Sequence, residues 1–191
     1  YGMNFDKWGA IHNNSVGIKD MWDALLPFLD YRGVMFAVND ATETLVSGRR
    51  DELAYYLYRD PEYAAVIDRG NRRDLLYGVP ELPEAESEKM KYSAFADNIG
   101  IVQLRSRTEG REQKDQIQAA LHYGTHGGHH GHFDRTNFLS MMRYGRSFYN
   151  PEMVWYSYPN YAYKFFVQTS LTKNMVVVDQ KMQEPQESFR T

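Results

Sequence analysis

The stretch Ile117-Gln-Ala-Ala-Leu-His-Tyr-Gly-Thr-His-Gly-Gly-His-His-Gly-His-Phe-Asp134 joins a strand-like run to residues crowded with histidine and glycine. Residues 122–134, which we call the histidine segment, hold five of the six histidines of the chain and four glycines. Glycine permits a tight backbone and imidazole titrates near neutral pH, so this composition predicts the floor of a polar site. Three uses remain open: metal binding, proton transfer, and a loop whose histidines bond only to backbone groups.

Strand signals lie on both sides of the histidine segment. They are short runs with a period near two, at residues 99–105, 117–123, 135–144 and 146–149. A charged turn at 107–114 joins the first two runs, and Gly145 separates the last two. Further on, the apolar run Met175-Val-Val-Val-Asp179 predicts a buried strand. The second half of the chain is therefore expected to form an antiparallel sheet assembly.

The first part of the chain has a helical pattern. Apolar residues at three-and-four spacing predict one helix over residues 16–29, and Pro61 fits the first turn of a shorter helix. Between them we expect another helix, capped by Asp40 or Thr42. Three helices with short connections predict an antiparallel helical layer.

A connector rich in proline and glutamate separates the two parts. It covers residues 81–90, between helices in residues 1–80 and strands in residues 91–191. Helices followed by an antiparallel sheet predict an α+β fold. Because the chain begins at Tyr1 without an initiator methionine, we expect it to be a piece of a larger protein.

Composition excludes several classes of function. With 191 residues, 42% of them hydrophobic, the chain can bury a sizeable core. A net charge of -3 with scattered basic residues argues against nucleic acid as a partner. No apolar run is long enough to span a bilayer. Since the chain has no cysteine, disulfides and thiolate metal sites are excluded. Composition does not indicate the oligomeric state.

Three motifs of the second half point to a known family. They are Gly127-Gly-His-His-Gly-His-Phe-Asp134, then Gly145-Arg with Pro151, then Thr172-Lys-Asn-Met-Val-Val-Val-Asp179 followed by Gln183. Together they resemble the signature of the heparinase II/III-like polysaccharide lyases, which show Gly-x-His-Gly-His-x-Asp, a hairpin ending in Asp-Pro-Gly, and Ala-His-Asn-Thr-Val-x-Val-Asp. The resemblance implies the last helices of an incomplete α/α toroid, followed by the start of an antiparallel β-sandwich.

The same resemblance implies a carbon-oxygen lyase that cleaves an acidic, uronate-containing polysaccharide or oligosaccharide by β-elimination. In the family the first histidine of His-Gly-His serves in catalysis, and that residue is His130 here. Tyr1 resembles the tyrosine of the family's Tyr-Gly pair and would be the acid, and a candidate for the base as well. Family members commonly act outside the cytoplasm, so a periplasmic or secreted location is expected.

The family also binds a structural zinc, and the resemblance breaks down at its ligands. The corresponding residues here are His132, Asn150 and Lys173. An amide oxygen is a weak zinc ligand and an ammonium group repels the cation, so no cofactor is expected. We expect the Lys173 ammonium to supply the positive charge near His132 and Asn150. Asp134 is expected to hold the turn rather than act as the base, because an exposed aspartate is weakly basic at neutral pH.

Other residues are candidates for contact with the glycan, since aromatic rings suit sugar faces and guanidinium groups suit anionic sugars. The candidates are His126, His129, Arg49, Trp155 and Tyr158. Each has a structural alternative, namely loop hydrogen bonding, a solvated helix face or a packed loop. Two other functions stay open: a non-catalytic carbohydrate-binding or structural relative, and a metal-dependent glycan hydrolase that uses the histidines directly.

Overall fold

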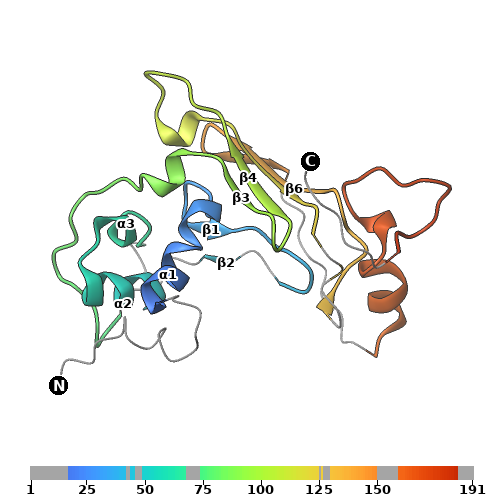
Figure 1. Ribbon diagram of the computed structural model, residues 1–191, viewed down its shortest axis with the longest axis horizontal. Helices are drawn as coiled ribbons and strands as arrows, with labels where there is room; N and C mark the ends of the chain where they lie inside the picture. Colours follow the sequence, from blue (N-terminus) through green and yellow to red (C-terminus); the bar gives the residue numbers. More distant parts are fainter. Residues whose placement is uncertain are drawn as a thin grey trace. The chain divides into compact units, whose positions relative to one another are not determined.

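The computed structural model describes residues 17–41, 44–45, 49–67, 74–124, 126, 130–149 and 159–184. The chain divides into two compact units: unit 1 is Tyr1–Val34 with Leu45–Lys91, and unit 2 is Met35–Thr44 with Tyr92–Thr191. A few short helices and an antiparallel five-stranded sheet make the fold α+β, as predicted (Figure 1). Within these ranges, no helix has the length and apolar character needed to cross a membrane.

Unit 1 is built from short helices. They are α1 (Ile18–Asp23), η3 (Leu26–Phe28), α2 (Arg49–Tyr58), α3 (Pro61–Ala64) and η4 (Lys89–Lys91). The single helix predicted over residues 16–29 is wrong, because α1 ends at Asp23 and a separate 3-10 turn follows. Pro27 lies in the first turn of η3, and its ring would clash with the preceding turn of a continuous α-helix.

The short helix predicted at Pro61 is confirmed. Asp60 caps α3 by accepting a hydrogen bond from the backbone N–H of Glu62 at 3.1 Å, and Pro61 follows it in the first turn. The same aspartate receives the Lys19 ammonium at 2.9 Å. The start of α3 is thus fixed both by its cap and by an ion pair to α1.

Tyr63 is the centre of the unit 1 core. Its side chain is fully buried, and its hydroxyl donates to the Asp23 carboxylate at 2.6 Å. Ala54 of α2 and Leu26 of η3 are buried in the same unit. The phenol therefore brings apolar surface into the core without leaving its hydroxyl unpaired.

The helix expected with Asp40 or Thr42 as its cap does not form there. Two short strands, β1 (Val34–Met35) and β2 (Thr44–Leu45), pair with each other, and α2 begins only at Arg49. Asp40 lies in the turn after β1, and its side chain binds residues of the histidine segment. Thr42 lies outside the described residues.

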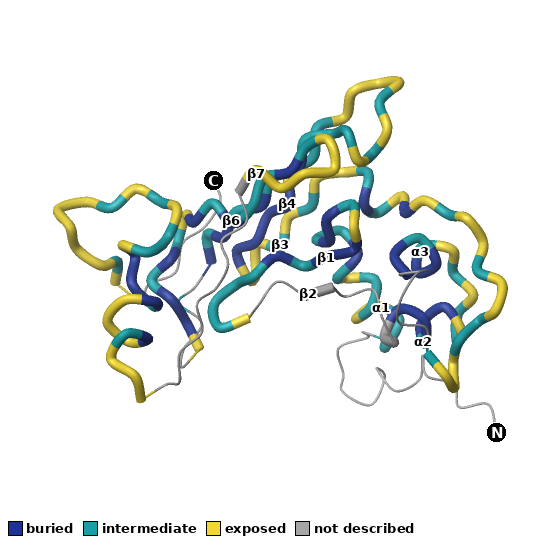
Figure 2. Tube along the Cα trace, turned by 180° about the vertical axis from the view of Figure 1, so that it is seen from behind, coloured by how far each residue is buried: buried dark blue, intermediate teal, exposed yellow. Residues whose placement is uncertain are grey.

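Unit 2 is organised by a five-stranded antiparallel sheet in which each strand pairs with the next one along the chain. Its strands are β3 (Ala94–Ala96), β4 (Ile101–Arg105), β5 (Gln118–His122), β6 (Asn137–Arg143) and β7 (Arg146–Tyr149). The predicted runs at 99–105 and 117–123 pair as expected, with Val102 opposite Leu121. The predicted hairpin around Gly145 is also confirmed. Figure 2 shows buried residues along β4 and β6.

Strand β5 places the histidine segment at the end of the sheet. Burial alternates along it, so that Gln118, Ala120 and His122 face the interior. A β-bulge in the pairing with β6 sets Ala120 opposite Ser140 but Leu121 opposite Phe138. Leu139 is thus the extra residue of β6, and it is buried.

After β7, the described residues 159–184 pack against the chain that follows the histidine segment. This stretch contains the π-helix η7 (Tyr163–Val167) and the 3-10 turn η8 (Ser170–Thr172). Phe133 N–H donates to the carbonyl of Gln168 at 2.9 Å, and Phe138 N–H donates to the carbonyl of Asn174 at 3.0 Å. The amide of Gln183 brackets Arg135, accepting from its N–H and donating to its carbonyl, each at 2.9 Å.

The buried strand predicted at Met175–Asp179 is wrong. The described residues there form no strand, and Val176 and Val178 are 84% and 70% exposed. The backbone hydrogen bonds described above reach Asn174, and beyond it Asp179 and Gln180 have positive φ values that turn the backbone. Apolar composition alone does not produce a strand without a partner for its backbone groups.

Gly100 provides a test of the packing at the end of β4. It has a φ of +67°, and a Cβ on it would lie 2.0 Å from the Cα of Gly124. Gly100→Ala is expected to lower the free energy of unfolding by roughly 2 kcal/mol or more, because backbone strain adds to a backbone clash. Urea unfolding measures the loss. Gly110→Ala is the control: its φ is +72° with no atom within 4 Å, and a cost of about 1 kcal/mol is expected. Equal losses would contradict the close approach.

Candidate functional site

The described histidines of the histidine segment have separate environments. His122, at the end of β5, is buried, and its Nδ1 lies 3.1 Å from an oxygen of the buried Asp134 carboxylate. His126 is partly buried and packs its ring against Phe133, with 4.5 Å between ring centroids. Neither of these pairs brings several imidazoles to one point.

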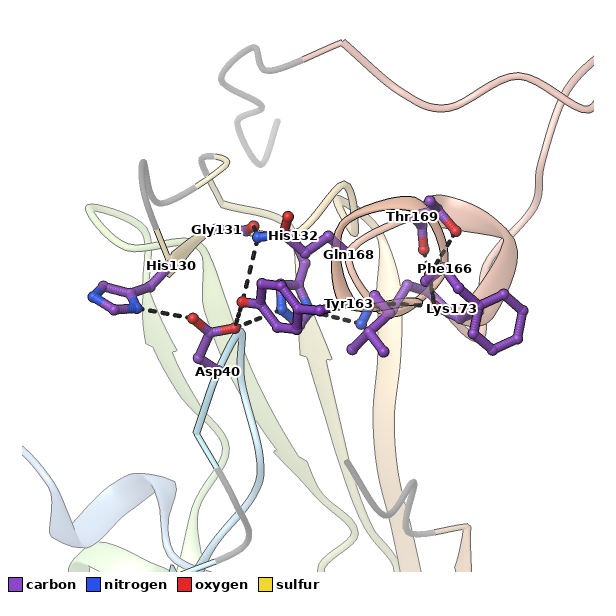
Figure 3. Close-up of polar contacts among 11 residues, drawn as sticks. Asp40, His130, Gly131, His132, Tyr163, Phe166, Gln168, Thr169 and Lys173 are labelled. Atoms are coloured by element: carbon purple, nitrogen blue, oxygen red, sulfur yellow. Dashed lines mark hydrogen bonds and ion pairs between the residues drawn. The ribbon is translucent and has the colours of Figure 1, made fainter. Parts of the chain in front are cut away.

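His130 is the exposed histidine of the site. Its side chain is 61% exposed, and its Nδ1 lies 2.8 Å from Oδ2 of Asp40. The Asp40 side chain is only 10% exposed. A solvent-facing imidazole is therefore held through one ring nitrogen by a nearly buried carboxylate (Figure 3).

His132, two residues further on, is on the buried side of the same carboxylate. It is 1% exposed, and its Nε2 lies 3.0 Å from Oδ1 of Asp40. Its other ring nitrogen, Nδ1, lies 2.7 Å from the Nζ of Lys173. Figure 3 shows His130 on one side of Asp40, with His132 and Lys173 on the other.

Tyr163 contacts Asp40 directly, and Gln168 contacts Tyr163. The buried Tyr163 hydroxyl donates to Oδ1 of Asp40, and its ring meets His132 edge to face with 6.2 Å between centroids. The Gln168 amide donates to the Tyr163 hydroxyl at 3.3 Å and to the carbonyl of Gly131 at 3.0 Å. These contacts fix both the carboxylate and the backbone between the two histidines.

Gly131 is required by the close approach of the backbone. A Cβ at this position would lie 1.6 Å from the carbonyl oxygen of His126. Only glycine fits at that distance, so the backbone at Gly131 can lie directly against the carbonyl group of His126. The glycine content of the segment thus has a structural reason here.

The partners of His132 define its protonation state. The Lys173 ammonium can only donate, so Nδ1 of His132 must accept and the ring proton lies on Nε2, where it is donated to Asp40. Burial, followed by the charge of Lys173, lowers the pKa of His132. Burial also lowers the pKa of Lys173, against the opposing charges of Asp134 and Asp40. The site is a chain of lysine, neutral imidazole and carboxylate.

This arrangement does not fit the zinc of the heparinase II/III-like family. Both ring nitrogens of His132 are engaged, and an ammonium group lies 2.7 Å from the one that would have to ligate a metal on that side. The described residues contain no group of three or more His, Cys, Asp or Glu side chains that could hold a metal ion. Asn150, the remaining position, lies outside the described residues.

The structure brings together only part of the predicted site. His130, His132 and Lys173 meet around Asp40, whereas Arg49 begins α2 in unit 1 and its side chain lies outside the described part. The other candidates also lie outside the described residues: Tyr1, His129, Trp155 and Tyr158. Asp134 pairs with His122 in the interior.

Sequence reasoning missed three residues of the site. Asp40 was expected to cap a helix, and Tyr163 and Gln168 carried no prediction of their own. Asp40 lies 90 positions before His130, and Tyr163 and Gln168 follow the histidine segment, with Gln168 37 positions after Gly131. The one local signal in the sequence is that Asp40 follows Asn39 in a short polar stretch.

The neutral, buried state of His132 predicts a dependence of stability on pH. Its pKa is lowered in the folded protein, whereas an unfolded histidine titrates near about 6.5. Between these two values the unfolded chain binds more protons, so stability is expected to fall as the pH drops below about 6.5. Urea midpoints measured at several pH values test this.

The substitution His132→Gln should flatten that pH dependence, since an amide can still donate to Asp40 but does not titrate. His126→Gln is the control and should keep a slope close to that of the unaltered protein, because His126 lies against Phe133 rather than Asp40. An unchanged slope in His132→Gln would show that His132 is not the titrating group.

Comparison with known proteins rests on structure alone. No protein-family model matches the chain, and no curated protein matches it. A solved structure described as a heparinase III gene product with methylated lysines is similar, with a TM-score of 0.63 and 17% sequence identity. The similarity covers 89% of this chain and 24% of that chain, so this chain spans about a quarter of the length of that heparinase III. At this identity the comparison shows a shared fold.

Proposed function

We propose that the protein is a polysaccharide lyase that cleaves a uronate-containing glycan by β-elimination, with His130 exchanging the proton. The observation that carries the proposal is an exposed imidazole whose Nδ1 lies 2.8 Å from a nearly buried carboxylate. Such a ring can accept a proton through its second nitrogen while the carboxylate stabilises the cation that forms. The fold shared with a heparinase III supports this choice of reaction.

The reaction requires a base, an acid and a way to neutralise the substrate carboxylate. His130 would take the proton from the carbon that bears the carboxylate. The electron pair of the broken carbon-hydrogen bond would form the new carbon-carbon double bond. The glycosidic carbon-oxygen bond then breaks, and its electrons go to the leaving oxygen. Tyr1 is the proposed proton donor to that oxygen.

The proposed architecture follows the same family. Residues 1–80 would form the last helices of an α/α toroid, 81–90 a linker, and 91–191 the first part of an antiparallel β-sandwich. The five-stranded antiparallel sheet of unit 2 supports the sandwich. The proposed substrate is an acidic polysaccharide or oligosaccharide, with His126, His129, Arg49, Trp155 and Tyr158 as contact candidates, and the proposed location is periplasmic or secreted.

A metal-dependent hydrolase is less well supported. Such an enzyme would need imidazole nitrogens that are available to a metal, whereas His122 is paired with Asp134 and His132 uses both nitrogens for Asp40 and Lys173. We propose instead that the Lys173 ammonium provides the positive charge that zinc supplies in the family. The site then needs no cofactor.

The lyase is tested by incubating the full-length protein with a panel of acidic glycans. A new unsaturated uronate absorbs ultraviolet light, and its appearance is the expected result. His130→Ala should lower kcat by roughly 10²–10⁴-fold, because it removes the proton acceptor. Thr108→Ala, an exposed position with no proposed role, should retain activity. Glycan binding without product would favour the non-catalytic relative, and chelator-sensitive cleavage without the chromophore would favour a hydrolase.

The replacement of zinc by lysine is tested separately, by elemental analysis of the purified protein. Zinc is expected at well below one equivalent, with no change in His132→Ala. Lys173→Met should lower the free energy of unfolding by about 1–3 kcal/mol, because the buried Nδ1 of His132 loses its donor. Stoichiometric zinc that disappears in His132→Ala would reject the proposal.

A further inference from the structure

We infer that Asp40 is the positioning residue for His130: it holds the ring with its proton on Nδ1 and so leaves Nε2 as the basic nitrogen. The role of His130 in catalysis rests on the proposed function, whereas the effect of Asp40 on the ring does not. Asp40 is in none of the sequence motifs that resemble the lyase family, since these motifs lie at Tyr1 and from Gly127 onward.

The two oxygens of the Asp40 carboxylate have different partners: one faces His130 and the other faces the protein interior. Oδ2 lies 2.8 Å from Nδ1 of His130, while Oδ1 accepts from the Tyr163 hydroxyl and lies 3.0 Å from Nε2 of His132. The two partners of Oδ1 are almost completely buried. The carboxylate is therefore oriented from the interior, and its outer oxygen presents a fixed acceptor to the exposed ring.

Hydrogen-bond chemistry then selects the tautomer of His130. A carboxylate oxygen is an acceptor, so the facing Nδ1 must carry the proton, and in the neutral ring Nε2 is then the nitrogen with a lone pair. When Nε2 takes a proton, the negative charge of Asp40 is 2.8 Å from the ring and stabilises the imidazolium. One carboxylate thus sets the orientation, the tautomer and the stability of the charged form.

The charges behind Asp40 keep this carboxylate from being an isolated buried anion. The Lys173 ammonium lies on the far side of the His132 ring, 2.7 Å from its Nδ1, and His132 passes a hydrogen bond on to Asp40. A neutral imidazole between a cation and an anion lets both stay charged in a buried site. Lys173 thus contacts His132, His132 donates to Asp40, and Asp40 accepts from His130.

The position of Asp40 in the fold explains how a residue so distant in sequence reaches the ring. Met35–Thr44, the turn region between β1 and β2, belongs to the same compact unit as the histidine segment. The chain leaves unit 1 for these few residues and returns to it at Leu45. A short excursion of the backbone thus supplies one side chain to the site.

The first experiment observes the ring nitrogens directly, by nitrogen-15 NMR of the full-length protein, with His130→Gln used to assign the signals. In the unaltered protein at a pH where the ring is neutral, we expect Nδ1 of His130 to be protonated and Nε2 to be unprotonated. Asp40→Asn should yield a mixture of the two tautomers. Glu112→Gln, the same change of carboxylate to amide at an exposed pair with Lys114, should leave the His130 signals unchanged.

The second experiment is kinetic and uses the same variants on the glycan that the lyase assay identifies. Asp40→Asn should lower kcat by at least about a hundredfold, because the His130 ring would be misplaced and partly in the wrong tautomer. KM should change little, because the residues that bind the glycan would be unaltered. Glu112→Gln should retain activity.

The outcomes separate the two proposals. A protein without lyase activity but with the Nδ1–H tautomer, lost in Asp40→Asn, would reject the proposed function and support the role of Asp40. An Nε2–H tautomer in the unaltered protein would overturn the role of Asp40, and this result does not depend on whether Asp40→Asn folds. Loss of activity in Asp40→Asn with an unchanged tautomer would also overturn it, since Asp40 would then act only on structure.

Discussion

A nearly buried carboxylate needs hydrogen-bond donors around it, and the structure of the site depends on the donors that surround Asp40. Leaving such a charge unpaired would cost several kcal/mol. Here three donors surround it, from His130, His132 and Tyr163. Two of them come from the histidine segment and one from η7, so one charge in the turn after β1 draws these parts of the chain together.

Two of the pairs that histidines of this segment form with carboxylates have different properties because their surroundings differ. The pair of His122 and Asp134 is sealed in the interior, at the end of β5. The pair of His130 and Asp40 has one exposed and one nearly buried member. The first lies wholly within the protein interior, whereas the second places an imidazole ring against solvent. Crowding of histidines along a sequence therefore does not by itself indicate a shared metal.

Sequence patterns could predict the elements whose cause is local. The strand pair around Gly145 and the helix start at Pro61 follow from turn and cap chemistry within a few residues. The predicted helix over residues 16–29 was wrong because the prediction relied on apolar spacing and gave no weight to Pro27, which lies in a separate 3-10 turn. The strand predicted after Asn174 was wrong because an apolar run forms a strand only where its backbone groups have a partner. In the site, His130 and His132 were found from their motif, and Lys173 from the position it replaces. Asp40 could not be found, because its partners lie about a hundred residues away.

These separations also bear on the order in which the protein acquires its parts. The contacts of Asp40 join residues 90, 92 and 123 positions apart, whereas the hairpins of the sheet join near neighbours. Closing long loops costs entropy before any contact repays it, so local hairpins tend to form first. The sheet of unit 2 would then form before the site around Asp40. Newly made protein would pass through a stage in which the sheet has formed but the contacts around Asp40 have not, until the turn after β1 packs against the histidine segment.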